Sequence, residues 1–227
     1  MTKTPVELVA FHGSGTSIDR FDYRFTNQGN DQNGSGFYFT TDIEEAIRYC
    51  TALYQGQPKL GGDSDPTVHV VRLKFENVLD CKDDRALSAA AVKKIILASP
   101  VLDDALTNFG DVEYEGRAAV LGEAVRLYVS RKGDTHVIKQ FHKLANDFFP
   151  EAEHTEAFNR AIFKATGIDA IKEDYGNRTH YVAFFPEQID ILARFQRDAL
   201  SPERTEIKVF LGADQEPTPS CRRRMSC

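Results

Sequence analysis

Two stretches decide the fold of this chain: His12-Gly13-Ser14 and Gly34-Ser-Gly-Phe-Tyr38-Phe-Thr-Thr-Asp42. The apolar run from Val6 to Phe11 leads into the first stretch and predicts a strand that ends at His12. Residues 13–36 are rich in Gly, Asn, Asp and Ser, which is typical of a loop. The aromatic run at 37–40 predicts the next strand, so the first stretch closes one strand and the second stretch contains another.

A helix is predicted directly after the second strand. Asp42 is a favoured N-cap residue, and Glu45 three positions later completes a pattern similar to a capping box. Both carboxylates also favour the positive end of the helix dipole. The apolar face of this helix contains Ala46, Tyr49, Cys50 and Leu53, and Tyr49 stands eleven positions beyond Tyr38.

The rest of the sequence predicts a helical middle between two groups of strands. A strand is expected at Thr67 to Phe75, where apolar and polar residues alternate. Helical spacing of apolar residues follows within residues 85–167, in segments at 87–98, 101–109, 116–130, 135–148 and 152–166. Strands return at 168–172, 179–185, 189–195 and 205–211. Segregation of strands and helices favours an α+β fold over alternating parallel βαβ units.

Length and composition predict one domain with an appendage. The chain has 227 residues, of which 41% are hydrophobic, and this is enough to bury a core. The domain is expected to span residues 1–212, with the helical block at 85–167 inserted in it. After Gly212 the composition shifts to Pro, Ser, Asp and Arg, which predicts a disordered tail over residues 213–227.

Charge and cysteine content narrow the class of partner and the compartment. A formal net charge of -6 argues against broad binding of phosphate backbones. The sequence has no run of 18 apolar residues and no apolar signal-peptide region at its start, so no membrane partner is expected. Its four cysteines lack metal-ligand spacing, and no metal site is predicted. We therefore expect a cytoplasmic protein, or one exported without a cleaved signal peptide.

Together, these two stretches and Tyr49 resemble the NAD pocket of the ADP-ribosyltransferase superfamily, in the branch typified by diphtheria toxin and the poly(ADP-ribose) polymerases. The shared features are a strand-end His-Gly-Ser, a Gly-x-Gly-aromatic-Tyr strand and a second Tyr one helix later. The resemblance implies split mixed β-sheets around an NAD cleft. It also implies transfer of ADP-ribose from NAD with release of nicotinamide.

The resemblance assigns roles to the residues of both stretches. It implies that His12 bonds a ribose hydroxyl, that the Gly13 backbone bonds the nicotinamide amide, and that Ser14 adds a hydroxyl contact. Tyr38 and Tyr49 are expected to stack on the two faces of the nicotinamide ring, because an aromatic face suits a cationic pyridinium.

The loop at 13–36 is expected, by the same resemblance, to cover the adenosine side of NAD. Arg20, Arg24 and Gln28 are candidates there for contacts with the diphosphate or the adenine. A solvated loop face remains the alternative explanation of these three side chains.

The sequence departs from the family pattern at the third element. Polymerase-like members carry a Glu at the start of a late strand, whereas this chain has Thr179-His180-Tyr181-Val-Ala-Phe, with His180 in the Glu position. A neutral imidazole bonds a hydroxyl but supplies no negative charge against a cationic transition state. Glu173, in the preceding loop, is a candidate to fold over the pocket. The catalytic candidates are therefore His12, Tyr38, His180 and Glu173.

Three functions stay open. The first is a mono-ADP-ribosyltransferase that uses NAD and a macromolecular acceptor, with the acidic charge favouring protein over nucleic acid as acceptor. The second is a catalytically weak or inactive NAD-binding relative that acts as a binding module, for which His180 is the main argument. The third is an unrelated nuclease that uses His12 as general base.

Overall fold

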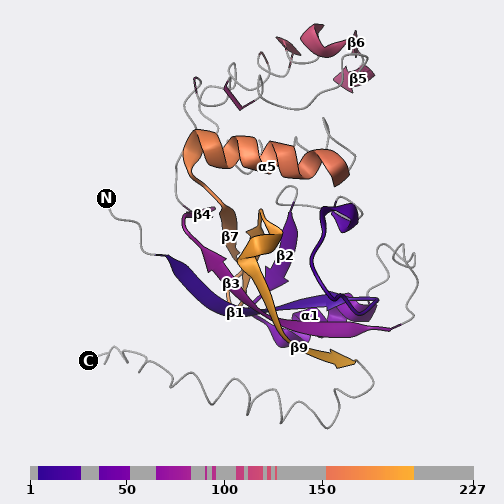
Figure 1. The fold of residues 1–227 in the computed structure, drawn as a ribbon, viewed down its shortest axis with the longest axis vertical. Coiled ribbons are helices and arrows are strands. Elements are labelled where there is room, and N and C mark those ends of the chain that lie inside the picture. Colours follow the sequence, from indigo (N-terminus) through magenta and orange to yellow (C-terminus); the bar gives the residue numbers. More distant parts are fainter. Residues whose placement is uncertain are drawn as a thin grey trace, which may run out of the picture.

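The computed structural model describes residues 5–26, 36–51, 65–82, 106–109, 112–119 and 152–196, together with residues 90, 94–95, 122–123 and 126. The strands of its main sheet are β1 (Val6–Ser14), β2 (Phe37–Thr40), β3 (Thr67–Phe75), β4 (Val78–Asp80), β7 (Ala170–Asp174), β8 (Thr179–Ala183) and β9 (Ile189–Gln196) (Figure 1). A separate hairpin is formed by β5 (Leu106–Phe109) and β6 (Val112–Glu115). Helices with complete bounds are α1 (Ile43–Thr51), α5 (Ala152–Thr166) and the short 3-10 helices η1 (Tyr23–Phe25) and η2 (Pro186–Gln188).

The main sheet is mixed. Within the described residues it has seven strands in the order β4-β7-β8-β2-β1-β3-β9. Neighbouring strands are antiparallel, except that β4 and β7 are parallel. A mostly antiparallel sheet with separate helices agrees with the α+β class that the sequence predicts.

The sheet is weakly joined between β1 and β2. These two strands share one registered pair, Phe11↔Thr40. By contrast, β1 pairs with β3 along its whole length, from Val6↔Phe75 to Ser14↔Thr67. The sheet is thus divided into a β4-β7-β8-β2 half and a β1-β3-β9 half.

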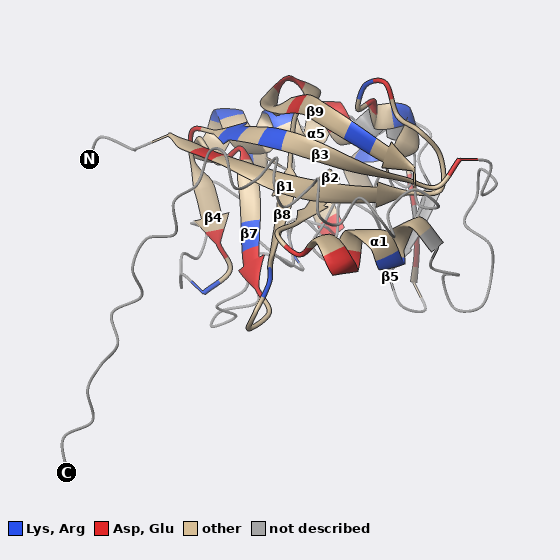
Figure 2. Cartoon of the chain, turned by 90° about the horizontal axis from the view of Figure 1, so that it is seen from below, with Lys and Arg blue, Asp and Glu red and all other residues tan. Residues whose placement is uncertain are grey.

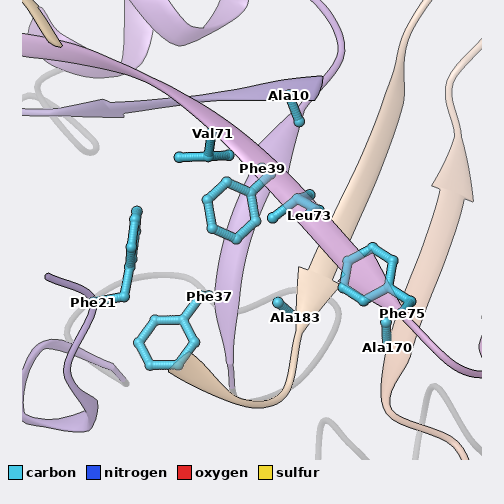
Figure 3. Packing of buried hydrophobic residues seen from close by; sticks show 9 residues of the cluster. All are labelled: Ala10, Phe21, Phe37, Phe39, Val71, Leu73, Phe75, Ala170 and Ala183. Carbon is cyan, nitrogen blue, oxygen red and sulfur yellow. The ribbon is translucent and has the colours of Figure 1, made fainter. Parts of the chain in front are cut away.

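Both halves contribute to the main core, which also takes one aromatic ring from the segment after β1. Its buried members are Ala10, Phe21, Phe37, Phe39, Val71, Leu73, Phe75, Ala170 and Ala183 (Figure 3). Phe37 and Phe39 flank Tyr38 on β2. Because side chains alternate along a strand, Tyr38 points to the face of β2 opposite this core.

Helix α1 packs on the other side of β1 and β3, below the long strands in the view of Figure 2. Its buried Ala46 and Cys50 contact a second cluster that includes Phe11, Val68 and Val70. Acidic residues lie in its first turn and a basic residue in its last turn, which is the favourable order for the helix dipole.

The far ends of β7 and β8 are fixed by a buried polar network around η2. The side-chain oxygen of Gln188 accepts hydrogen bonds from the backbone N–H groups of Phe184 (3.0 Å) and Phe185 (2.8 Å). Its amide nitrogen donates to the carboxylate of Asp169 at 3.1 Å. Asp169 in turn accepts from the backbone N–H of Asn77 at 2.9 Å. This network holds the end of β8 opposite to His180.

Two predicted strand ends were wrong. Strand β1 does not end at His12 but continues to Ser14, because β3 offers pairing partners up to Thr67. Strand β7 begins at Ala170 and reaches Asp174, where it pairs with Thr179. Glu173 therefore lies on a strand and not in a loop.

One predicted helix in the middle of the chain was also wrong. The segment at 101–109 was expected to be helical, but Leu106–Phe109 forms β5, which pairs with Val112–Glu115. The sequence between these two strands is Gly110-Asp111, which is a hairpin signal. Helix α5 confirms the predicted helix at 152–166.

The helix predicted at 135–148, the strand predicted at 205–211 and the tail at 213–227 lie outside the described residues. In the part of the chain that the structure describes, no helix is long and apolar enough to cross a membrane.

Candidate functional site

His12 connects the two sequence stretches where the sheet divides. Its Nδ1 lies 2.8 Å from the backbone oxygen of Tyr38. A carbonyl oxygen only accepts, so Nδ1 carries a proton and donates. The imidazole packs edge-on against Phe21, with 5.2 Å between ring centroids, and tilted against Phe39, with 5.8 Å between centroids. A polar side chain at this split thus bonds across it and is held among aromatic rings.

His69 lies opposite His12 in the β1–β3 register and is fully buried. Its Nε2 accepts a hydrogen bond from the backbone N–H of Ile18 at 2.9 Å, which fixes the segment after β1. Burial lowers the pKa of His69 to about 4, against a smaller opposing effect of the His12 backbone. A neutral imidazole therefore lies beside His12, with 6.0 Å between the two ring centroids. The sequence analysis did not select His69, since only the strand register reveals its position.

Gly13 is packed against α1. A Cβ at this position would lie 1.9 Å from the backbone oxygen of Ala46 and 3.0 Å from the backbone nitrogen of Cys50. The glycine is therefore required for helix packing, whatever its backbone does toward a ligand. The adjoining Ser14 ends β1, and its Oγ accepts from the backbone N–H of Thr16 at 3.3 Å.

The two tyrosines of the second motif lie on β2 and α1. Tyr38 shares a face of β2 with Thr40, and Tyr49 is 44% exposed on α1. Partial burial raises the pKa of the Tyr49 hydroxyl, the Glu45 carboxylate raises it further, and Arg178 lowers it. These effects place the Tyr49 hydroxyl in the electrostatic environment of Glu45 and Arg178.

His180 and Glu173, the two candidates for the third element, face each other across β8 and β7. The hydroxyl of Tyr175 donates to Glu173 Oε2 at 2.6 Å, and the Tyr175 ring lies 4.7 Å from the His180 ring. On its other side, His180 is registered with Thr40 of β2. The structure thus brings His180 and Glu173 together, and β8, which carries His180, lies next to the strand that carries Tyr38.

The sequence analysis missed the role of Glu45. Its carboxylate, which is 6% exposed, was expected to complete a capping box. Instead, Oε2 accepts a hydrogen bond from Thr40 Oγ1 at 2.6 Å and lies 2.7 Å from His180 Nε2. Oε1 lies 2.9 Å from Arg178 Nε. The cap of α1 is supplied by Asp42, which accepts from the backbone N–H of Glu44 at 3.0 Å.

The remaining candidates are Arg20, Arg24 and Gln28 of the loop at 13–36. Arg20 has a side chain that is 81% exposed and lies 3.6 Å from Asp22, while Arg24 lies 3.2 Å from the same carboxylate. A groove of about 770 Å³ beside Arg20 is lined by more acidic than basic side chains, including Asp19 and Glu187. Gln28 and Gly34 lie outside the described residues. No group of three or more His, Cys, Asp or Glu side chains in the described part could hold a metal ion.

One of three comparisons with known proteins identifies a family. A family described as ADP-ribosyltransferase in polyvalent proteins matches the chain over residues 6–192. These residues run from the first residue of β1 into β9 and include every candidate named above. No curated protein and no solved structure matches the chain.

Proposed function

The chain belongs to the ADP-ribosyltransferase family of polyvalent proteins, and on that premise we propose that it is an NAD-dependent mono-ADP-ribosyltransferase. In this reaction the bond between nicotinamide and ribose breaks, and a macromolecular acceptor takes the ADP-ribose. The observation that carries the proposal is the 2.8 Å hydrogen bond between His12 and Tyr38, since it joins the two motifs that the family uses for NAD.

The reaction passes through a transition state with positive charge on the ribose carbon and its ring oxygen, as in other glycosyl transfers. The residues around His12 fit the nicotinamide side of NAD. An imidazole such as that of His12 can bond a ribose hydroxyl. Gly13 and Ser14 would hold the amide, and Tyr38 and Tyr49 would stack on the ring.

The position of His180 favours a second candidate, in which the chain binds NAD without cleaving it. Family members of the polymerase type place a carboxylate where this chain has an imidazole. A binding module would be stabilised by NAD against heat but would release no nicotinamide.

Nicotinamide release separates the candidates. The full chain is mixed with NAD at high protein concentration, and nicotinamide is measured by chromatography beside a thermal unfolding curve. Release with stabilisation supports the transferase, stabilisation without release supports the binding module, and neither result contradicts both. A nuclease that uses His12 would instead lose activity on RNA or DNA in a His12→Ala variant, with no stabilisation by NAD.

Variants test the individual roles. We expect His12→Ala to depress turnover strongly. Glu173→Gln and His180→Ala test the third element: intact activity in the former and loss in the latter would assign that role to His180. Biotin-tagged NAD incubated with candidate lysates would then identify the acceptor, for which we propose a protein because the chain is acidic.

A further inference from the structure

A buried carboxylate bonded to an imidazole stands at the third element of the site. Glu45 comes from α1 and His180 from β8, and the distance between Glu45 Oε2 and His180 Nε2 is 2.7 Å. Both side chains are largely shielded, with 6% of the Glu45 side chain and 15% of the His180 side chain exposed. A charge-assisted hydrogen bond of this kind holds a ring in one orientation.

We propose that Glu45 positions and polarises His180, and that His180 is the base that accepts the proton of an acceptor hydroxyl. This inference rests on the proposed transferase function and names the class of acceptor atom. Glu45 acts through His180 and is a positioning residue, while His180 touches the reacting hydroxyl.

The hydrogen bonds set the tautomer of His180. Thr40 donates its hydroxyl proton to Glu45 Oε2, and Arg178 lies at the other carboxylate oxygen, so both neighbours suit an ionised carboxylate. An ionised carboxylate only accepts, and His180 Nε2 must then carry its proton. The lone pair of the neutral ring is left on Nδ1, where a proton can be accepted. The same logic orients the histidine of a Ser-His-Asp triad.

The position of Arg178 bears on whether the Glu45 carboxylate stabilises the cationic ribose or acts through His180. Its guanidinium lies 2.9 Å from Glu45 Oε1, and the two formal charges cancel at that separation. The Glu45–Arg178 pair therefore offers no net negative charge against the cationic ribose, and the other carboxylate near His180 is that of Glu173 on β7. Proton acceptance by His180 is the chemistry that its bond to Glu45 favours.

The proposed step balances. The acceptor oxygen forms a bond to the ribose carbon as the bond from that carbon to the nicotinamide nitrogen breaks. Nicotinamide leaves with the electron pair of the broken bond, so the pyridinium becomes neutral. The hydroxyl proton moves to His180 Nδ1 and from there to water.

This chemistry selects a hydroxyl as acceptor. A carboxylate is already ionised near neutral pH and attacks without a base. A hydroxyl keeps its proton in this range and gains from an imidazole placed to take it. We therefore expect acetal-type links to hydroxyl groups and not ester links to acidic side chains.

The first test compares Glu45→Gln with Glu44→Gln in the full chain. Glu44 is the exposed neighbour on the same helix, so its variant makes the same charge change outside the cluster. Nicotinamide release is measured with water as acceptor over a range of pH. Glu45→Gln is expected to lower kcat by about 100-fold or more with little change in KM for NAD, whereas Glu44→Gln keeps the wild-type values.

The pH dependence of kcat distinguishes a positioning role of Glu45 from a purely structural role. The charged and titratable groups that face His180 are Glu45 from α1, Glu173 from β7, and Arg178 and Tyr175 from the turn before β8. Loss of the Glu45 charge leaves Arg178 to disfavour the protonated ring, so the acid limb of the profile should move to lower pH. A partly unfolded variant would lose amplitude without any such movement.

Each outcome decides the inference. A lower kcat with a displaced acid limb supports it. An unchanged kcat in Glu45→Gln overturns the inference. So does a decrease in kcat that equals the unfolded fraction of the variant while the acid limb of the pH profile stays in place. Both outcomes leave the proposed function standing. A wild-type chain that releases no nicotinamide overturns both. Links in tagged acceptors that neutral hydroxylamine cleaves, as it does esters, would overturn the hydroxyl assignment.

Discussion

Replacing Gly13 by alanine tests whether this glycine is needed for packing or for a ligand. The added Cβ would lie 1.9 Å from the backbone oxygen of Ala46. Carbon–oxygen contacts in proteins are tolerated at about 3.3–3.6 Å, so α1 would have to retreat by about 1.5 Å from β1. Because the obstacle is helix backbone, no rotamer change relieves it.

Overpacking of this kind costs about 1–3 kcal/mol of folding free energy. In a chain of this size, each kcal/mol lowers Tm by about 2–4 °C. We therefore expect Gly13→Ala to unfold several degrees below the wild type, as measured by circular dichroism or calorimetry. Retreat of α1 also displaces Glu45 and Tyr49, so the variant should bind NAD more weakly.

Gly122→Ala is the matched control. A Cβ at Gly122, which is helical, meets nothing within 4 Å, so this variant should unfold at or slightly above the wild-type Tm. Should Gly13→Ala unfold at the same temperature as the wild type and as the control, the packing argument is refuted. Loss of NAD binding with an unchanged Tm would instead assign Gly13 to the ligand alone.

Three further predictions follow from buried or half-buried side chains. Gln188→Leu should lower the free energy of unfolding by about 2–4 kcal/mol, since two backbone N–H groups at the end of β8 lose their acceptor; a denaturant midpoint within error of the wild type would contradict this. His69 has its pKa lowered from 6.5 to about 4, so as the pH falls the unfolded chain takes up a proton on this residue before the folded chain does. The contribution of neutral His69 to the free energy of unfolding is therefore complete above pH 6.5, and about 3 kcal/mol of it is lost as the pH falls to about 4. Urea titrations at pH 7 and pH 4.5 should show this loss in the wild type but not in His69→Gln, and equal losses would rule the explanation out. Tyr38→Ala should weaken NAD binding about tenfold while Tyr38→Phe keeps the stacking ring and the affinity, as measured by calorimetry; equal affinity in all three proteins would exclude stacking.

Strands with clear alternation and a helix with local start signals could be predicted from the sequence. The bounds of β2 and β3 agree with the prediction because their patterns are decided by residues within each strand. The extension of β1 to Ser14 and of β7 to Asp174 depends on partner strands, which no local pattern reveals. Strand β5 was predicted as helix because short apolar runs fit both periods.

The candidate site shows the same limit. His12, Tyr38 and Tyr49 could be selected as candidates because they lie in or near two short motifs that are close together in the chain. Glu45 was assigned to a helix cap, since a Glu three positions after an Asp fits that local pattern. Its actual partner, His180, is 135 positions away. A local sequence pattern does not reveal a contact between residues so far apart, so it favours the nearby cap.

The division of the sheet explains why polar side chains gather at this place. Where two neighbouring strands separate, their backbone N–H and C=O groups lose each other as partners, and each buried group left unpaired costs free energy. His12 compensates by donating to the Tyr38 carbonyl, and Thr40, at the one registered pair, gives its hydroxyl proton to Glu45. Side chains of the candidate site thus supply hydrogen bonds at the split. The imidazole of His12 and the carboxylate of Glu45 therefore have structural roles at the split, and the reaction proposed for this chain would use groups that the fold already places there.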